Sequence, residues 1–214
     1  MKPALPQLAQ PLREAPLTPT AEDALSARVD AEGLCFSHDT LENVTGASLE
    51  FSGCAFDHCE FRDCELKRLC FVDCVLDHCE LCNLRLEKVT FQRVRFSHCR
   101  MTGAEFLRAA LMNVTLENCA RDYAVFSECK LDHTLLASCR LRESLWQDAQ
   151  LKQTELTVCD LQSAQIHYTP LKGLDLSTCA LDGLQIDLPD LRGARVTAAQ
   201  AVAFSRLLGL EITD

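Results

Sequence analysis

The amino-acid sequence predicts an all-β solenoid, in which the chain winds into four-sided coils stacked along one axis. The first observation is a period of five: of the 33 positions taken in fives from Phe36 to Val196, 31 hold Leu, Phe, Ile, Val, Met or Trp. Only Gly46 and Arg121 depart from it. The second observation is that cysteine and histidine recur at intervals of twenty residues. Self-similarity at a fixed period indicates a repeat architecture and decides the fold class before any local signal.

The period of five constrains the backbone. It fits neither an α-helix, with about 3.6 residues per turn, nor a flat strand that alternates every two. It needs a chain that turns after each short extended piece, so that two side chains of every five point inward and three point outward. The second inward position lies two residues before each large one and holds smaller side chains, as at Cys54, Ala104 and Val114. The register never slips between residues 34 and 196, so we expect no inserted loop.

The interval of twenty residues indicates four sides per coil. Eleven of the fourteen cysteines occupy the small inward position, and seven of them form one column. A second, outward column holds four histidines. We interpret the cysteines as buried thiols that pack as small hydrophobic groups, because parallel side chains on stacked coils lie wider apart than a disulfide allows. The columns are Cys59, Cys79, Cys99, Cys119, Cys139, Cys159 and Cys179, and His38, His58, His78 and His98.

Neighbouring histidine and cysteine residues, as in His78–Cys79, invite an interpretation as zinc ligands. We predict no metal site, because the cysteine points into the coil while the histidine points to solvent, and tetrahedral sites use clustered ligands. The sequence also lacks GxSxG, P-loop, HExxH and dinucleotide-binding glycine patterns. Its carboxylates lie on the outside of a convex rod. We therefore predict a protein that is not an enzyme, without catalytic residues or cofactor.

Arg121 occupies an inward position, where a buried and unpaired guanidinium is costly. Two outcomes are open. Either the coil bulges and turns Arg121 outward, or a carboxylate such as Asp122 pairs with it. The functional alternative to a plain distortion is a contact patch that displays Arg121, Asp122 and Tyr123 together.

Composition and charge narrow the class of protein. The chain has 214 residues, 48% hydrophobic and 24% charged, which is typical of globular domains. Its net charge of −10 argues against binding to nucleic acid and for a basic partner or plain solubility. No apolar run is long enough to span a bilayer, and prolines break the N-terminal residues where a secretion signal would need an apolar stretch. We expect a cytoplasmic protein.

The two ends of the array lie outside the register. Residues 1–33 are predicted to form an N-terminal extension and cap, with a short helix that begins after Thr20 as its N-cap. Residues 197–214 begin with a capping box, Thr197 to Gln200, and Gly209 stops the helix that follows. Residues 34–196 are the solenoid between them.

The C-terminal helix and tail carry more apolar surface than the closing of one coil requires, which favours self-association. The alternative is a monomer whose helix folds over the last coil. The predicted dimerisation residues are Val202, Phe204, Leu207, Leu208, Leu210 and Ile212.

Residues 34–196 resemble the pentapeptide-repeat family, whose consensus is A(D/N)LXX. The resemblance implies a right-handed quadrilateral β-helix; here Cys often replaces Ala and the Asp/Asn position is poorly kept. The C-terminal part is similar to the Qnr quinolone-resistance proteins, through the segments LKGLDLS (171–177) and LRGARV (191–196) and the helix-and-tail ending. The uninterrupted register resembles the loop-free members of chromosomal Gram-positive type, such as the mycobacterial protein MfpA.

That resemblance implies a homodimer joined through its C-terminal ends, which mimics DNA, binds DNA gyrase and in some members topoisomerase IV, and relieves poisoning by fluoroquinolones. Residues 34–196 hold 24 acidic and 17 basic residues, a net charge of −7. We expect the acidic residues of the C-terminal half to form the topoisomerase-facing surface: Glu143, Asp148, Glu155, Asp160, Asp175, Asp182, Asp187 and Asp190.

Two other functions remain open at this stage. One is a cytoplasmic scaffold whose repeats carry protein–protein interactions unrelated to topoisomerases. The other is an immunity protein against a toxin or antibiotic that targets gyrase.

Overall fold

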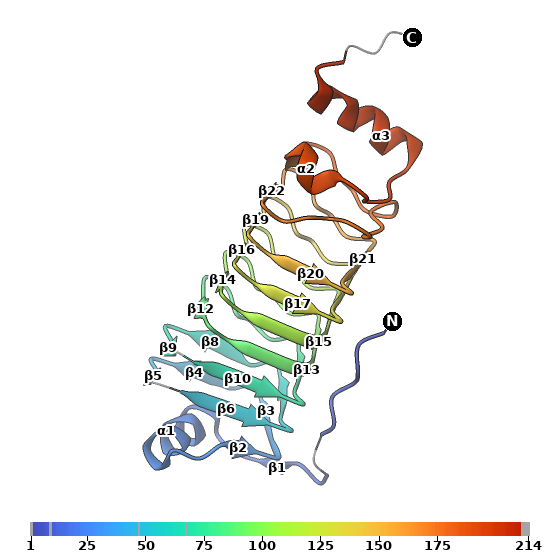
Figure 1. Ribbon diagram of the computed structural model, residues 1–214. Coiled ribbons are helices and arrows are strands. Elements are labelled where there is room, and N and C mark those ends of the chain that lie inside the picture. The colour runs from blue at the N-terminus through green and yellow to red at the C-terminus, as the bar shows by residue number, and fades with distance from the viewer. Residues whose placement is uncertain (1, 9, 47, 67, 211–214) are drawn as a thin grey trace.

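The computed structural model of the protein describes residues 2–8, 10–46, 48–66 and 68–210. Short parallel strands stack into a solenoid of about 8 turns, with helices at both ends (Figure 1). Each inward residue pairs with the residue twenty positions further on, as in Phe36 with Phe56 and Phe126 with Trp146. The predicted quadrilateral β-helix and its twenty-residue coil are confirmed.

The strands fall on four sides, named here in chain order. The first side holds β1 (Arg13–Glu14), β3 (Leu34–Ser37), β7 (Ala55–Asp57), β11 (Val75–Asp77), β18 (Leu135–Ala137) and β21 (Glu155–Thr157). The second side holds β4 (Thr40–Glu42) and β8 (Glu60–Arg62), and single bridges continue it from Glu80 to Ala180.

The third side holds β5 (Thr45–Gly46), β9 (Glu65–Leu66), β12 (Arg85–Glu87), β14 (Glu105–Leu107), β16 (Val125–Ser127), β19 (Leu145–Gln147), β22 (Gln165–His167) and β23 (Gln185–Ile186). The fourth side holds β2 (Ala31–Glu32), β6 (Leu49–Ser52), β10 (Leu69–Val72), β17 (Lys130–Asp132) and β20 (Gln150–Lys152). β13 (Thr90–Ser97) and β15 (Ala110–Glu117) run on from the fourth side to the first.

The core is a stack of apolar layers inside the coils. Aromatic rings stack along the axis, with centroids 5.2 Å apart for Phe106 and Phe126 and 4.0 Å apart for Phe126 and Trp146. The predicted inward cysteines are buried or half-buried free thiols. Their Sγ atoms donate to backbone carbonyls of the preceding coil, as from Cys99 to Leu76 O at 3.4 Å, and the hydroxyl of Thr134 does the same at 3.3 Å. Small side chains that can donate a hydrogen bond therefore suit the smaller inward position.

Most corners of the coil fall two residues after a large apolar residue and have a positive φ. Asparagine, aspartate and histidine tolerate this left-handed region better than most residues. His38, His58, His78 and His98 all occupy such corners, with φ of 51°, 51°, 52° and 55°. The corner geometry thus gives a structural reason for the histidine column.

Gly46, one of the two departures from the period of five, is explained by the N-terminal helix. α1 (Leu17–Ala27) covers the first coils, with Leu17, Ala21 and Ala24 buried. Its Leu25 fills the space that a side chain at position 46 would take: a Cβ there would lie 2.5 Å from Leu25 Cδ2. The helix supplies the apolar group that the repeat omits.

The predicted start of this helix was wrong. α1 begins at Leu17, after Pro16, and Thr20 lies inside it. The cap is supplied from elsewhere in the chain, because Leu17 N donates to Asp39 Oδ2 at 2.6 Å and Thr18 Oγ1 donates to Thr40 O at 2.7 Å. A local sequence pattern cannot reveal a cap that comes from the next coil.

The segment before the helix runs along the outside of the rod (Figure 1). Ala4 N donates to Asn113 Oδ1 at 3.1 Å, and Gln7 N donates to Asp73 Oδ1 at 3.0 Å. Arg93 also holds Asp73, through bonds of 2.7 and 2.6 Å, and this guanidinium lowers the pKa of the Asp73 carboxyl. The strands β1 and β2 pair with β3 and β6. The division at residue 33 stays a prediction.

The C-terminal end contains α2 (Leu188–Leu191), α3 (Ala198–Phe204) and a 3₁₀ turn, η1 (Ser205–Leu208). The predicted capping box is confirmed: Gln200 N donates to Thr197 Oγ1 at 3.1 Å and Thr197 N donates to Gln200 Oε1 at 2.8 Å. Gly209, with φ of 72°, ends the segment. None of the described helices is long and apolar enough to cross a membrane.

Arg121 corrects both structural expectations. It keeps its inward position, is 1% exposed, and its guanidinium carbon lies 4.7 and 5.1 Å from the ring centroids of Phe106 and Phe126. Nε donates to Met101 Sδ at 3.2 Å, but Nη1 and Nη2 find no hydrogen-bond partner among the described residues. Asp122 lies half-buried and pairs with Arg140 instead. Contacts with aromatic faces take the place of the expected carboxylate.

We predict that Arg121→Leu stabilises the protein. Burial lowers the pKa of the Arg121 guanidinium, because desolvation disfavours its charged form. Replacing an uncompensated buried charge by an apolar side chain should raise the free energy of unfolding by about 1–4 kcal/mol. Urea unfolding followed by circular dichroism measures the change. Arg121→Lys keeps the charge without the planar contact and should lower stability; a less stable Leu variant would contradict the prediction.

A second stability prediction concerns Val158, a β-branched residue at a corner with φ of 55°. Such residues pay about 1–2 kcal/mol in the left-handed region. Val158→Asn should therefore raise the free energy of unfolding by about 1 kcal/mol. Asn118 occupies the same corner two coils earlier, with φ of 54°, so Asn118→Val is the reciprocal control and should lower it. Equal stability of the two variants would refute this explanation.

Candidate partner-binding surfaces

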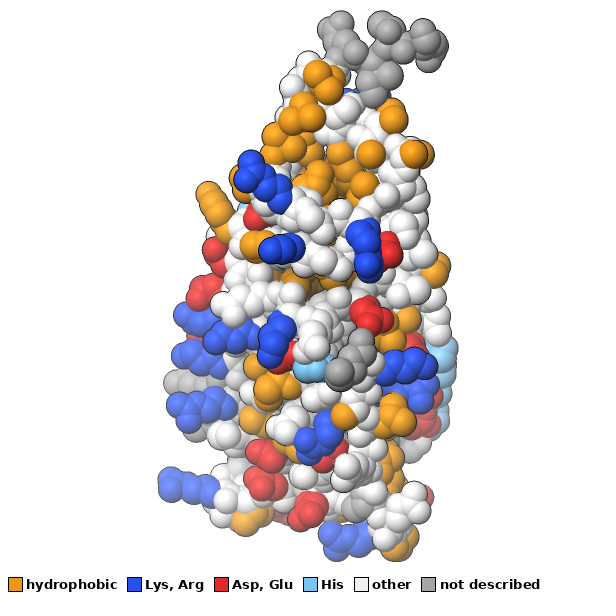
Figure 2. All heavy atoms as spheres, turned by 45° about the vertical axis from the view of Figure 1, so that its right-hand side comes forward, with side chains coloured by type: hydrophobic (Ala, Val, Ile, Leu, Met, Phe, Trp, Pro, Cys, Tyr) orange, Lys and Arg blue, Asp and Glu red, His pale blue; other side chains and the backbone are white. Residues whose placement is uncertain are grey.

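The outer face of the rod is made of charged columns. Basic side chains pair with acidic ones on the same or an adjacent coil, as in Arg100–Glu80 at 3.4 Å and Arg95–Glu117 at 2.8 Å. Lys and Arg lie among Asp and Glu over the middle and lower parts of the view in Figure 2. Exposed pairs of this kind contribute about 0–1 kcal/mol each. They set the surface potential more than the stability.

The predicted acidic residues are placed as follows. Glu143 is exposed and accepts a hydrogen bond from Tyr123 Oη at 3.0 Å. Asp160 and Asp175 lie in ion pairs, with Arg142 and with Arg195. Asp187 Oδ2 lies 3.6 Å from His167 Nδ1. Asp148, Glu155 and Asp182 are exposed.

Asp190 does not fit the predicted surface. It is 7% exposed, within the short helix α2, and its backbone carbonyl accepts from Leu171 N at 2.8 Å. The period of five predicts which side chains point outward only within the coils, and Asp190 lies in a helical turn. An acidic surface at this end therefore consists of the other seven carboxylates.

The register shows which of the seven lie together. Glu155 and Asp175 fall in one column on the first side, because strand partners are twenty residues apart. Glu143, Asp160 and Asp182 follow the second side and its corner, whereas Asp148 and Asp187 flank the corner between the third and fourth sides. The seven carboxylates are spread over several sides of the C-terminal half of the rod, with none on the fourth side, and do not form a single patch.

The C-terminal helix presents an apolar face. The side chain of Gln200 ties α3 to the last coils, donating to Leu176 O at 3.0 Å and to Cys179 O at 2.9 Å. Phe204 is partly buried against the core. Four other predicted dimerisation residues are exposed: Val202, Leu207, Leu208 and Leu210. Ile212 lies outside the described residues. Hydrophobic side chains gather toward this end in Figure 2.

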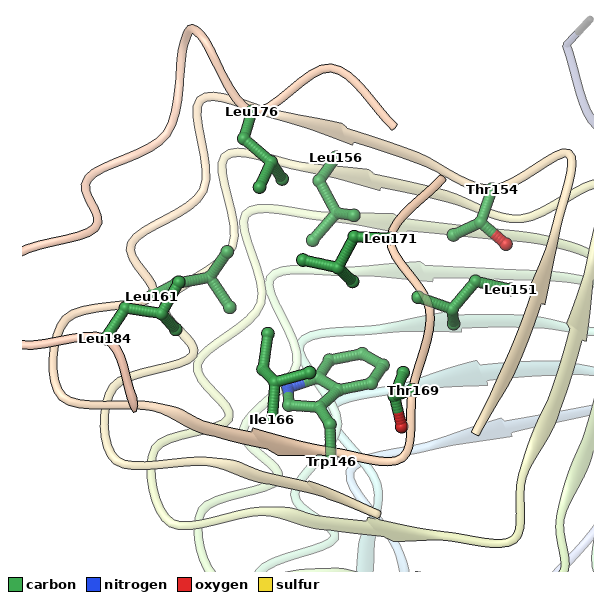
Figure 3. Close-up of a pocket in the computed structure, with 10 residues that line it drawn as sticks. All are labelled: Trp146, Leu151, Thr154, Leu156, Leu161, Ile166, Thr169, Leu171, Leu176 and Leu184. Carbon is green, nitrogen blue, oxygen red and sulfur yellow. The ribbon is translucent and has the colours of Figure 1, made fainter. Parts of the chain in front are cut away.

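The core beneath this end contains a small cavity of about 20 Å³ (Figure 3). Leucines of successive coils point into it, and Trp146 lies on one side. Its two hydroxyls are engaged with the backbone, since Thr154 donates to Leu131 O and Thr169 to His167 O. Apolar cavities of this size stay dry. The cavity is a packing defect of the last coils and offers no anchor for a polar ligand.

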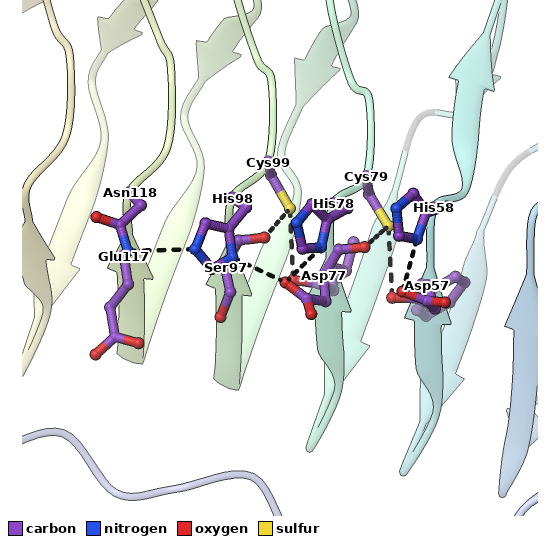
Figure 4. Close-up of polar contacts among 12 residues, drawn as sticks. Asp57, His58, Asp77, His78, Cys79, Ser97, His98, Cys99, Glu117 and Asn118 are labelled. Atoms are coloured by element: carbon purple, nitrogen blue, oxygen red, sulfur yellow. Dashed lines mark hydrogen bonds and ion pairs between the residues drawn. The ribbon is translucent and has the colours of Figure 1, made fainter.

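The histidine column combines with carboxylates that sequence reasoning overlooked (Figure 4). Asp57 Oδ1 lies 2.9 Å from His58 Nδ1, while Asp77 Oδ1 lies 3.2 Å from His78 Nδ1 and 3.3 Å from His98 Nδ1. Burial works against ionisation of Asp77, but the imidazoles outweigh it and hold its pKa below the usual range. The repeated tripeptide Asp-His-Cys at 57–59 and 77–79 was the available signal.

Comparison with known proteins agrees with this architecture. A family model described as a pentapeptide repeat region matches residues 89–166. No curated protein matches the chain. Full-length QnrB1, a plasmid-mediated fluoroquinolone resistance protein, is 21% identical, with 92% of this chain and 95% of that chain covered and a TM-score of 0.53.

Two trypsin-treated variants of QnrB1 give similar results. Both are 22% identical to this chain. The alignment with the first covers 84% of this chain and 90% of the variant, with a TM-score of 0.55. The alignment with the second covers 86% of this chain and 91% of the variant, with a TM-score of 0.53. At these identities the likeness establishes the fold, and function has to be argued from surfaces. Residues 89–166 match the pentapeptide repeat region, and the solenoid of the chain has the fold of QnrB1.

Proposed function

We propose that the protein is a Qnr-like, DNA-mimicking partner of type II topoisomerases, which binds DNA gyrase and protects it from fluoroquinolones. The observation that carries the proposal is the continuous four-sided rod, which aligns with nearly the whole length of a fluoroquinolone resistance protein. Topoisomerase IV is the second target that the family resemblance implies. No chemical step is required of the protein.

The charge distribution supports a basic partner. Residues 141–196 hold eight acidic and five basic residues, and of the seven carboxylates Asp160 and Asp175 pair with arginines. Complementary charge steers association and fixes orientation more than it adds affinity. We propose that these carboxylates face the positively charged DNA-binding surface of the topoisomerase. Carboxylates on several sides, unlike a single patch, present negative charge to a saddle-shaped partner from several directions.

The apolar C-terminal end supports a two-fold dimer. Exposed leucines and valine at one end of a rod form a patch that a second copy can cover, and a two-fold axis lets the same patch serve both subunits. In such a dimer the seven carboxylates of each copy lie on either side of the centre. Residues 197–214 then form the dimerisation segment, residues 34–196 the topoisomerase-facing rod, and residues 1–33 the cap of the free end.

We predict that Val202→Asp together with Leu208→Asp produces a monomer. Both side chains are more than half exposed, at 53% and 60%, so the substitutions should spare the folded coil. Two buried charges at an interface oppose association. Light scattering should give half the wild-type mass. Leu5→Asp, on a leucine of the N-terminal segment that is 71% exposed, is the control and should keep the wild-type mass. A double variant of unchanged mass would place any dimer interface elsewhere.

The function itself is tested in a gyrase supercoiling assay. The protein should raise the fluoroquinolone concentration that half-inhibits supercoiling, or inhibit supercoiling without the drug. Binding should weaken severalfold between about 0.05 and about 0.2 M salt, because exposed charges are screened. The variant Glu143→Gln/Asp148→Asn/Asp182→Asn should lose most of the effect. The same change in charge at the N-terminal end, Glu22→Gln/Asp23→Asn/Asp30→Asn, should leave it intact.

The remaining alternatives predict other results. A scaffold for unrelated proteins would neither inhibit supercoiling nor relieve the drug up to tens of micromolar protein, and that outcome would end the topoisomerase proposal. An immunity protein would protect gyrase from a toxin while leaving fluoroquinolone inhibition unchanged.

A further inference from the structure

Four imidazoles stack on the corners that lead from the first side to the second. The ring centroids of His38, His58, His78 and His98 are 4.7 Å apart at each step, with interplanar angles of 20°, 1° and 15°. Their spacing is imposed by the coil repeat, and their corners hold the backbone in one conformation. The imidazole rings therefore form a preorganised array of nitrogen atoms on the surface that can act as metal ligands.

Carboxylates complete two clusters in this array. In each, the possible ligand atoms lie within 4.8 Å of one another: Asp77, His78 and His98 form one cluster, and His38, Asp57 and His58 form the other. In Figure 4 the side chains of His78 and His98 both approach Asp77. Both Nδ1 atoms face the same carboxylate oxygen, Oδ1 of Asp77.

The distances in the first cluster suit a small divalent ion. Zinc binds imidazole nitrogen at about 2.0–2.1 Å and carboxylate oxygen at about 2.0–2.2 Å, which puts neighbouring tetrahedral ligands about 3.3–3.5 Å apart. The Asp77 oxygen lies 3.2 Å from one nitrogen and 3.3 Å from the other. By contrast, Asp132 and His133 lie 2.7 Å apart, the distance of a direct hydrogen bond. Neither Asp77 contact is as short as that one.

We propose that Asp77, His78 and His98 form a zinc-binding site. Two imidazoles and a carboxylate are ligands that favour zinc over calcium or magnesium. Solvent would occupy the open position, because the imidazoles and carboxylate lie on the outer face.

The cysteines take no part in this site. The thiols of Cys79 and Cys99 are buried and donate to carbonyls inside the coil. From the sequence, each histidine was expected to act only with the cysteine beside it, which points into the coil. The fold instead brings histidines of different coils together at one aspartate.

The test is a titration of Zn²⁺ into the full-length chain without an affinity tag, followed by calorimetry. Wild type should bind zinc and gain thermal stability, and excess Mg²⁺ should not compete. His78→Asn/His98→Asn should weaken binding at the Asp77 site by at least tenfold, as loss of ligands requires. Asparagine is native at the corresponding corner, residue 118, so the variant should fold.

His133→Asn is the matched control, because His133 also sits at a corner beside an aspartate, with φ of 52°, but the positions twenty residues away are Asn113 and Gln153. It should bind zinc as wild type does. Asp77→Asn should weaken binding without changing the histidine stack. Equal zinc affinity in wild type and the double variant, or equal losses in the double variant and His133→Asn, would overturn the proposal.

Discussion

The structure depends on one constraint, the twenty-residue register between parallel coils. Each backbone strand bonds to the coils before and after it, and each large apolar side chain lies on the one from the previous coil. Insertion or deletion of one residue in any coil would turn inward side chains outward for the rest of the rod. The unbroken period of five is the sequence expression of this constraint. It explains why 31 of 33 positions obey the rule while the outward positions vary freely.

The same register governs the surface. A residue's neighbours on the outside are those twenty positions away, so ion pairs, stacked imidazoles and carboxylates form along columns. Arg93 pairs with Asp73, and Lys152 with Asp132, each one coil apart. A binding surface of this protein is consequently made of residues that are distant in sequence but equivalent in the repeat. The histidine column, for example, consists of residues spaced twenty apart in the sequence.

Periodicity therefore predicted most of the fold, including the inward thiols and the histidine column. It failed where a contact comes from outside the local repeat. The cap of α1 is Asp39 from the adjoining coil, and Gly46 is complemented by Leu25 of the helix. Arg121 is held between aromatic rings of neighbouring coils, a contact that no local motif announces. The candidate acidic surface was predicted by residue type alone, so the side on which each carboxylate lies, and the burial of Asp190, emerged only from the structure.

The two ends of the rod are closed unequally, and this asymmetry bears on assembly. At the N-terminal end, α1 buries Leu17, Ala21 and Ala24 and fills the gap at Gly46. At the C-terminal end, α3 buries no residue between positions 198 and 204, and the coils below it enclose a cavity. An end coil that leaves apolar groups in water loses part of the free energy that every inner coil gains from its neighbours. A second copy placed against α3 would supply the missing neighbour, which makes this end, and not the N-terminal one, the expected place of self-association.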